Sequence, residues 1–213
     1  MVHLMDKSWK KIYDDNALKD LPDYSASCWT EDGFLELFKV CFKIVSKLKN
    51  VKSVLDVGCG FGSYCAEFKR RGFSVVGLDY AKNVVAEAAL KNPEIKFVEG
   101  DAYNLPFDDN SFDLVVCIGV LQCVYDSDKI IKELCRVSKK YVLVSTLLRR
   151  QKLDKPLRVL EKKLETDSWP TRDYHPSDLE VLFVDEGFFV TNTLSNKGSL
   201  IKDGFFTLAT KKP

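Results

Sequence analysis

Short apolar segments alternate with amphipathic segments along most of the chain. The short segments are rich in β-branched residues and are bounded by turn residues, which is typical of buried strands; they are KSVLDVG, FSVVGLD, IKFVEGD, FDLVVCIGV and YVLVST. The segments between them have the length and spacing of helices; they are SYCAEFKRRG, AKNVVAEAALK and DSDKIIKELCRVS. This alternation predicts an α/β fold in which helices cover both faces of a mainly parallel sheet.

The two ends of the chain have different patterns. Between residues 32 and 50, one apolar helical face is predicted from Phe34, Phe38, Cys41, Val45 and Leu48. Residues 149–165 carry a leucine stripe at helical spacing, DLEVLFVDEGFF predicts a helix followed by a strand, and GFFTLATKK predicts a final strand. We expect one domain over 1–213, made of an N-terminal helical cap (1–50), a core (51–146), an insertion (147–175) and a closing helix and strands (176–213).

Length and charge narrow the possible functions. The 213 residues are 46% hydrophobic, enough for one substantial core. Lys and Arg total 32 against 31 Asp and Glu, so no overall field attracts nucleic acid. Seven cysteines without a CxxC pair, together with only two histidines, indicate reduced thiols, no metal site and a cytoplasmic protein. The N-terminus has no apolar signal core and no long apolar run follows, so we expect no membrane span.

A glycine turn follows the first predicted strand, in VLDVGCGFGSY at residues 54–64. A dinucleotide-binding turn needs glycine at the sixth position of its motif, where this chain has Ser63. Asp56, Asp79 and Asp101 lie near the ends of three predicted strands, so they are expected around one crevice. Three carboxylates would repel a pyrophosphate and would suit a ligand with an ammonium, a sulfonium and a ribose diol.

Four motifs in order carry a family resemblance: DVGCGFG, GLDYA, EGDAYNLPFDDNSFDLVVCIGVL and YVLVST. Together they resemble the class I S-adenosylmethionine-dependent methyltransferases, particularly the small-molecule type. The likeness is strong over 51–146 and loose from there to residue 213. It implies a Rossmann-like fold with a seven-stranded, mostly parallel sheet whose last strand is antiparallel. Residues 51–146 would then bind S-adenosyl-L-methionine, leaving S-adenosyl-L-homocysteine as product, and 147–175 would lie on the substrate side.

The resemblance also assigns cofactor residues. Asp56 would order the glycine turn near the methionine amino group, Asp79 would accept the ribose hydroxyls, and Asp101 would accept the adenine amino group. The remaining residues expected to contact the cofactor are Gly58, Cys59, Gly60, Gly62, Tyr80, Ala102, Cys117 and Ile118. The simpler interpretation is that Asp56 and Asp79 cap loops, as aspartates at strand ends often do. Cys59 and Cys117 are expected as small buried hydrophobes rather than nucleophiles.

The segment after the fourth predicted strand departs from the family pattern. It reads LQCV, where relatives often have a Glu-His or His-His pair, so a general base at this position is in doubt. Gln122 is still expected to hydrogen-bond a substrate. His175 is the remaining candidate base, but it precedes Pro176 and is alternatively a helix entry residue. The family's Lys-Pro-Gly-Gly turn before the fifth strand is also missing.

Aromatic residues gather in the segments expected around the acceptor. We predict that Tyr13, Trp29 and Tyr174 contact the substrate together with Gln122, and Tyr24 and Trp169 lie nearby in sequence. Such residues form a lid over an apolar or planar acceptor, or else packing that anchors a segment.

The functional prediction is methyl transfer to an O, N or C atom of a small metabolite by a monomer or homodimer. One alternative is an RNA or protein methyltransferase that uses the basic stretch 149–163, which holds seven Lys or Arg and two acidic residues. We consider this less favoured, because the whole chain is nearly neutral. The other alternative is an S-adenosylmethionine-binding protein without turnover.

Overall fold

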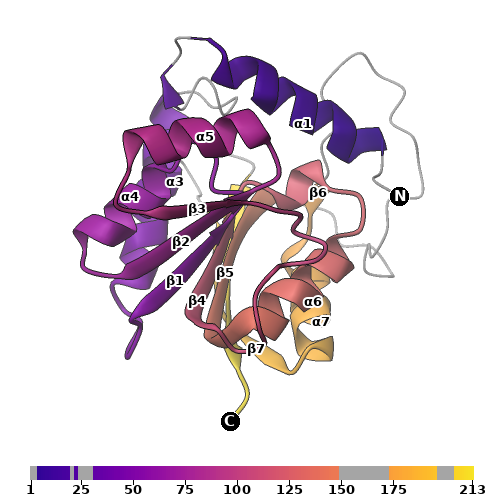
Figure 1. Ribbon diagram of the computed structural model, residues 1–213. Helices are drawn as coiled ribbons and strands as arrows, with labels where there is room; N and C mark the ends of the chain where they lie inside the picture. The colour runs from indigo at the N-terminus through magenta and orange to yellow at the C-terminus, as the bar shows by residue number, and fades with distance from the viewer. Residues whose placement is uncertain (1–3, 20–21, 24–30, 149–172, 196–203) are drawn as a thin grey trace.

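The computed structural model describes residues 4–19, 22–23, 31–148, 173–195 and 204–213. A central sheet has helices on both faces (Figure 1). In chain order the strands are β1 (Ser53–Val57), β2 (Ser74–Asp79), β3 (Lys96–Glu99), β4 (Phe112–Ile118), β5 (Ser138–Leu148), β6 (Asp173–Tyr174), β7 (Phe188–Ser195) and β8 (Gly204–Lys211). The helices are α1 (Leu4–Ala17), α3 (Glu31–Val45), α4 (Ser63–Arg70), α5 (Lys82–Lys91), the one-turn η1 (Leu121–Cys123), α6 (Ser127–Val137) and α7 (Pro176–Asp185).

The strand order across the sheet is β3-β2-β1-β4-β5-β8-β7. The first five strands of this order are mutually parallel, and β8 is antiparallel to both β5 and β7. The predicted seven-stranded, mostly parallel sheet with an antiparallel last strand is therefore confirmed. The structure adds the two-residue strand β6, which pairs with the end of β5 and was not predicted.

The order of strands reverses next to β1. The chain moves outward from β1 through β2 to β3, then crosses back to place β4 on the other side of β1. At such a reversal the loops leave the sheet in opposite directions, which opens a crevice at the carboxyl ends of the strands. The topology alone thus places a ligand site beside the loop after β1.

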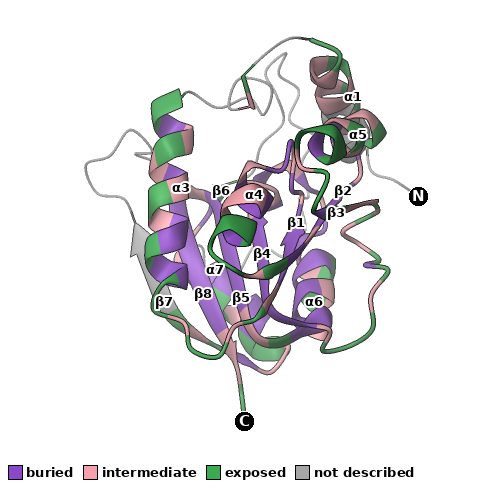
Figure 2. Cartoon of the chain, turned by 60° about the vertical axis from the view of Figure 1, so that its left-hand side comes forward, coloured by how far each residue is buried: buried purple, intermediate pink, exposed green. Residues whose placement is uncertain are grey.

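Each face of the sheet has its own apolar core. On one face, β1 and β4 pack with α3 and α4 through residues such as Val54, Leu114, Cys41 and Phe68. On the other face, the alternate residues of the same strands pack with α6 and α7. Figure 2 shows buried residues along the strands and exposed residues on the outer side of α3. The predicted coverage of both faces is confirmed.

The N-terminal part differs in detail from the prediction. The helix expected over 32–50 ends at Val45, so Leu48 lies beyond it, and Phe34 and Phe38 are only partly buried. The predicted burial of Cys41 and Val45 is confirmed. The other buried residues of the helix are Gly33, Leu37, Phe42 and Ile44. The preceding helix α1 lies along α5 at the top of the molecule in Figure 1. No helix among the described residues is long and apolar enough to cross a bilayer.

The ends of the expected insertion belong to the sheet. β5 continues to Leu148, and Tyr174 pairs with Leu148 as part of β6. The basic stretch 149–163 lies outside the described residues. Before β5, α6 ends at Val137 and the strand begins at Ser138, so helix leads directly into strand where the family turn is missing.

Candidate active site

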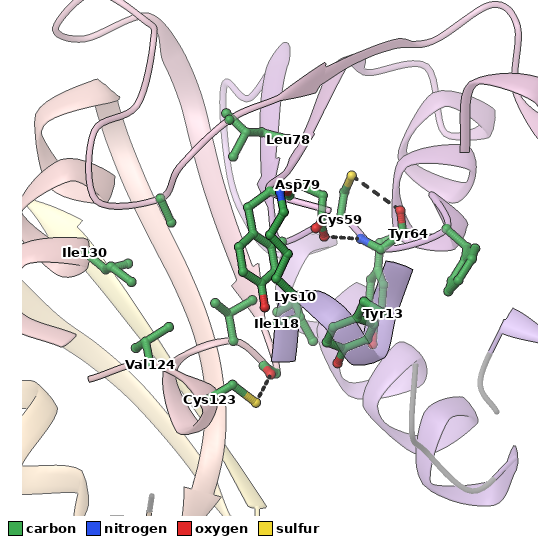
Figure 3. A pocket seen from close by; sticks show the side chains of 18 of the residues that line it. Lys10, Tyr13, Cys59, Tyr64, Leu78, Asp79, Ile118, Cys123, Val124 and Ile130 are labelled. Carbon is green, nitrogen blue, oxygen red and sulfur yellow. Dashed lines mark hydrogen bonds between the residues drawn. The ribbon is translucent and has the colours of Figure 1, made fainter. Parts of the chain in front are cut away.

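A cavity of about 480 Å³ opens at the carboxyl ends of β1 to β4. It is lined by the glycine turn after β1, the loops after β2, β3 and β4, and residues of α1 and α3. Figure 3 shows Cys123, Val124 and Ile130 on one side, Tyr13 and Tyr64 on the other, and Asp79 and Lys10 between them. This is the place predicted for the cofactor. The predicted residues that line it are Gly58, Cys59, Gly60, Asp79, Tyr80, Asp101, Ala102, Ile118 and Tyr13.

The glycine turn has a backbone that favours glycine. Gly58, Gly60 and Gly62 have φ angles of 75°, 53° and 84°, which side-chain-bearing residues seldom adopt. A Cβ atom added at Gly58 would lie 2.2 Å from Cγ2 of Val120, and one at Gly62 would lie 2.9 Å from Cζ of Phe97. At these two positions any larger residue would therefore have to displace a neighbouring side chain. Gly62 does not line the cavity.

Asp79 joins the end of β2 to the glycine turn. Its Oδ2 accepts a hydrogen bond from the Gly60 amide at 3.0 Å, and its Oδ1 accepts one from the Ala81 amide at 3.0 Å. The side chain is buried, and this burial raises the pKa of the carboxyl above its ordinary value. Two backbone donors therefore fix the direction of a carboxylate at the cavity wall.

Asp56 is buried and does not line the cavity. Its Oδ2 accepts a hydrogen bond from the thiol of Cys65 at 3.3 Å, in the first turns of α4. Burial raises the pKa of the Asp56 carboxyl to about 7. The position is consistent with the expected role of ordering the turn, and a contact with the cofactor remains a prediction. Cys117 is fully buried in the core and likewise does not line the cavity.

The loop after β3 forms another wall. Asp101 is exposed, and its Oδ1 accepts a hydrogen bond from the Tyr103 amide at 2.9 Å. The hydroxyl of Tyr103 in turn accepts hydrogen bonds from the amides of Tyr125 and Asp126 at 3.1 and 3.3 Å. Tyr103, which was not predicted, therefore ties the loop after β3 to the segment before α6.

The predicted substrate residues are dispersed. Tyr13 lines the cavity, whereas Trp29, with Tyr24 and Trp169, lies outside the described residues. Tyr174 is fully buried, and its hydroxyl donates to the Leu121 carbonyl at 3.0 Å, away from the cavity lining. Gln122 is 5% exposed and also does not line the cavity. Its Oε1 is buried without a hydrogen-bond partner among the described residues.

His175 caps the start of α7. Its Nδ1 accepts a hydrogen bond from the Ser177 amide, and Oδ2 of Asp178 accepts one from the His175 amide at 2.9 Å. His175 is therefore a helix entry residue, as the alternative interpretation predicted. His175 does not line the cavity, and a catalytic role for it remains a prediction without geometric support in the described residues.

Several lining residues were missed from the sequence. They are Lys10, Asp23, Phe34, Leu37, Tyr64, Leu78, Glu99, Tyr103, Val120, Cys123, Val124 and Ile130, among others. The spacing of Lys10, Tyr13 and Ala17 is a helical signal that was available in the sequence. Phe34 and Leu37 belong to the predicted helix, but their helical pattern shows which side is apolar and not that one end reaches a cavity.

The strand order, the glycine turn and the cavity beside it define the class I methyltransferase fold. Residues 55–144 match the family described as the methyltransferase domain, and the fold resembles that of S-adenosylmethionine-dependent class I methyltransferases.

Individual proteins are similar to this chain over different lengths. The demethylmenaquinone methyltransferase of Shouchella clausii is 40% identical over 95 residues, which cover 41% of this chain and 40% of that protein. An uncharacterised protein of Methanocaldococcus jannaschii is 28% identical over 187 residues, covering 86% of this chain and 80% of that one. The crystal structure of magnesium protoporphyrin IX methyltransferase from Synechocystis PCC 6803 with bound S-adenosylmethionine has a TM-score of 0.73 at 17% identity, covering 99% of both chains.

The extent of these matches limits what they show. This chain spans about two fifths of the length of the demethylmenaquinone methyltransferase that it matches. The likeness to the solved structure, at its low identity, is a likeness of fold.

Proposed function

We propose that the protein transfers a methyl group from S-adenosylmethionine to a small molecule. The observation that carries the proposal is the Asp79 carboxylate, held by the Gly60 and Ala81 amides at the wall of the cavity. A carboxylate fixed in this way accepts hydrogen bonds from a vicinal diol. When bound, the cofactor supplies an electrophilic methyl group. The residues of this chain orient it and exclude water.

The charged groups that line the cavity fit this cofactor better than they fit a pyrophosphate. Besides Asp79, the carboxylates of Asp23, Glu99 and Asp101 line the cavity. They would repel the phosphates of a dinucleotide and attract a ligand with positive charge. The cofactor residues assigned from the resemblance that line the cavity are therefore retained in the proposal.

The acceptor is proposed to be a small molecule with an apolar body. One part of the lining is apolar and comes from α3, the end of β4, the loop after β4 and α6. It consists of Phe34, Leu37, Ile118, Val120, Val124 and Ile130. The names of two relatives, which specify demethylmenaquinone and magnesium protoporphyrin IX, support a small-molecule acceptor. The methylated atom is left open as O, N or C. The cysteine pattern supports the further proposal of a cytoplasmic protein. The proposed oligomeric state is a monomer or homodimer.

One labelling experiment tests the proposal. The protein is incubated with methyl-tritiated S-adenosylmethionine and a cell extract freed of endogenous methyltransferases by heating. We expect label in a small organic-soluble product, and none with Asp79→Asn. The matched control is Asp108→Asn, because Asp108 is exposed and does not line the cavity.

Size fractionation of the labelled material separates the alternatives. Label in RNA or protein would contradict a small-molecule acceptor and support the macromolecular alternative. Binding of the cofactor without any labelled product in extracts of several growth conditions would support the binding protein without turnover.

A further inference from the structure

Lys10 places a positive charge in a cavity lining that contains several carboxylates. Among the described residues that line the cavity, it is the only one with a Lys, Arg or His side chain. It comes from α1, outside the segment that matches the methyltransferase family at 55–144. The family match therefore does not include Lys10.

The Lys10 ammonium contacts two neighbouring strand ends. Its Nζ donates a hydrogen bond to the backbone carbonyl of Tyr80, directly after β2, and lies 5.5 Å from the centroid of the Tyr80 ring. The same atom is 3.9 Å from Oε1 of Glu99, the last residue of β3. One cation thus links the end of β2 to the end of β3, where Asp79 and Asp101 lie close in sequence.

Helix α1, which carries Lys10, is held in place by a hydrogen bond to α5 and by apolar packing. The Oδ1 atom of Asp14 accepts a hydrogen bond from the Asn83 amide at 3.0 Å, near the start of α5. Tyr13 and Ala17 pack against a small core that contains Ala81 and Val84. Because residues 10, 13, 14 and 17 share one side of a helix, these contacts hold Lys10 over Tyr80. Figure 3 shows Lys10 in the middle of the cavity view, between Cys123 on one side and Tyr13 on the other.

We propose that Lys10 is a positioning residue for the adenosine end of the cofactor, acting through Tyr80 and Glu99. It holds the Tyr80 backbone and ring in place beside the ribose-binding carboxylate, and it offsets the charge of Glu99 near the expected adenine site. The inference rests on the proposed function. It adds a cofactor-site residue from the N-terminal helix. It also predicts that substitution of Lys10 weakens the binding of the adenosine half of the cofactor.

The test measures dissociation constants by calorimetry for two ligands, S-adenosylhomocysteine and 5′-methylthioadenosine. The second ligand keeps the adenosine and lacks the amino acid. Because a hydrogen bond to a charged group changes an equilibrium by roughly tenfold or more, Lys10→Met should weaken both ligands by about tenfold and by equal factors. Lys10→Arg should restore most of the affinity, since it keeps the cation. Lys11→Met is the matched control, because Lys11 is adjacent, exposed and absent from the cavity lining.

Each result decides between the two proposals. If wild-type protein does not bind S-adenosylhomocysteine, both the proposed function and the proposed role of Lys10 are contradicted. If the wild type binds and Lys10→Met binds equally well, only the role of Lys10 is overturned. A loss for S-adenosylhomocysteine alone would overturn the assignment to the adenosine end. Equal loss in Lys11→Met, or in Lys10→Arg, would also overturn it. Thermal melting without ligand is expected to agree among all four proteins, and a lower midpoint for Lys10→Met alone would indicate a structural role instead.

Discussion

The Gly60 amide donates a hydrogen bond of 3.0 Å to the Asp79 side chain, so the middle of the glycine turn is bound to the end of the neighbouring strand. The amides of Gly58 and Cys59 also donate to the same strand, both to the Leu78 carbonyl, at 2.7 and 3.0 Å. Three consecutive turn residues therefore hold β2. A change in the shape of the turn must displace the carboxylate that we propose for ribose binding.

Gly58→Ala is expected to destabilise the protein and weaken the cofactor site. The substitution imposes a strained φ of 75° and places a methyl group 2.2 Å from Val120, which must move. We expect a loss of about 2 to 5 kcal/mol in the free energy of unfolding, as the sum of backbone strain and overpacking. Urea unfolding measures this loss. Weaker binding of S-adenosylhomocysteine should accompany it.

Gly72→Ala is the matched control for Gly58→Ala. Gly72 has a φ of 89°, but an added Cβ meets nothing within 4 Å, so only strain is introduced. Its expected cost is about 1 to 2 kcal/mol, with unchanged ligand affinity. Equal costs at the two positions would show that the Val120 contact is relieved without penalty.

The buried carboxyl of Asp56 is expected to make stability fall as pH rises. Its pKa is raised from 3.8 to about 7 by burial, so between these values the folded protein holds a proton that the unfolded chain has released. Raising the pH across this window therefore favours the unfolded chain. Asp56→Asn cannot ionise, and its stability relative to wild type should increase from pH 5 to pH 8, by at most ~3 kcal/mol. Urea titrations at pH 5, 6.5 and 8 measure this difference.

Asp113 provides a comparison with the opposite sign. Burial acts to raise the pKa of this carboxyl, but hydrogen bonds from the Lys52 and Ser53 amides and from the Lys140 ammonium lower it to about 2. Its stabilising effect should be complete above about pH 4 and be lost as pH falls toward 2. Asp113→Asn should thus cost stability at neutral pH by an amount that does not change from pH 5 to pH 8. A pH-independent difference for Asp56→Asn as well would refute the titration assigned to Asp56.

Two substitutions of His175 distinguish a helix-capping role from a role as the general base. His175→Ala should lose about 1 kcal/mol of stability because the Ser177 amide loses its acceptor. Asparagine is a good capping residue, so His175→Asn should regain most of that loss. If the residue serves only as a cap, His175→Asn keeps full methyl transfer in the labelled-extract assay. Abolished transfer with intact S-adenosylhomocysteine binding would instead support the catalytic prediction.

Gln122→Met is expected to stabilise the protein. The buried Oε1 of Gln122 has no hydrogen-bond partner among the described residues, and methionine has similar length without that oxygen. Removing an unsatisfied buried carbonyl should raise the free energy of unfolding by about 1 kcal/mol, measured by urea unfolding. Thr207→Val is the control, because its buried Oγ1 is also unpartnered in the described part of the chain and Thr207 does not line the cavity.

If Gln122 also binds the acceptor, Gln122→Met should reduce labelled product while Thr207→Val leaves it unchanged. A gain in stability without any change in product would remove Gln122 from the predicted substrate contacts. A loss of stability in both variants would show that these atoms are satisfied in solution.

The strands and the glycine turn were predictable because their signals are local. An apolar run that ends in Asp, followed by glycines, specifies a strand and a turn without reference to the rest of the chain. The cavity placement of Asp79 and Tyr80 followed, since parallel strands end at a common edge of the sheet. The same reasoning cannot separate Asp56, which bonds to the Cys65 thiol and does not line the cavity, from Asp79, which lines it.

The parts that could not be predicted depend on long-range packing. Tyr174 was expected near the substrate, yet it is wholly buried because β6 pairs with the end of β5, a contact with no local signal. His175 lies next to it in sequence and is occupied by capping α7. The position of α1 over α5, and with it the role of Lys10, depends on contacts about seventy residues apart.

The unequal numbers of acidic and basic groups around the cavity bear on product inhibition. Asp23, Asp79, Glu99 and Asp101 line it, with Lys10 as the one basic side chain among the described lining residues. A sulfonium cofactor carries one positive charge more than the thioether left after the methyl group departs. The attraction to these carboxylates weakens at that moment. A cavity wall of this charge prefers the loaded cofactor over the spent one, and so favours exchange after each turnover.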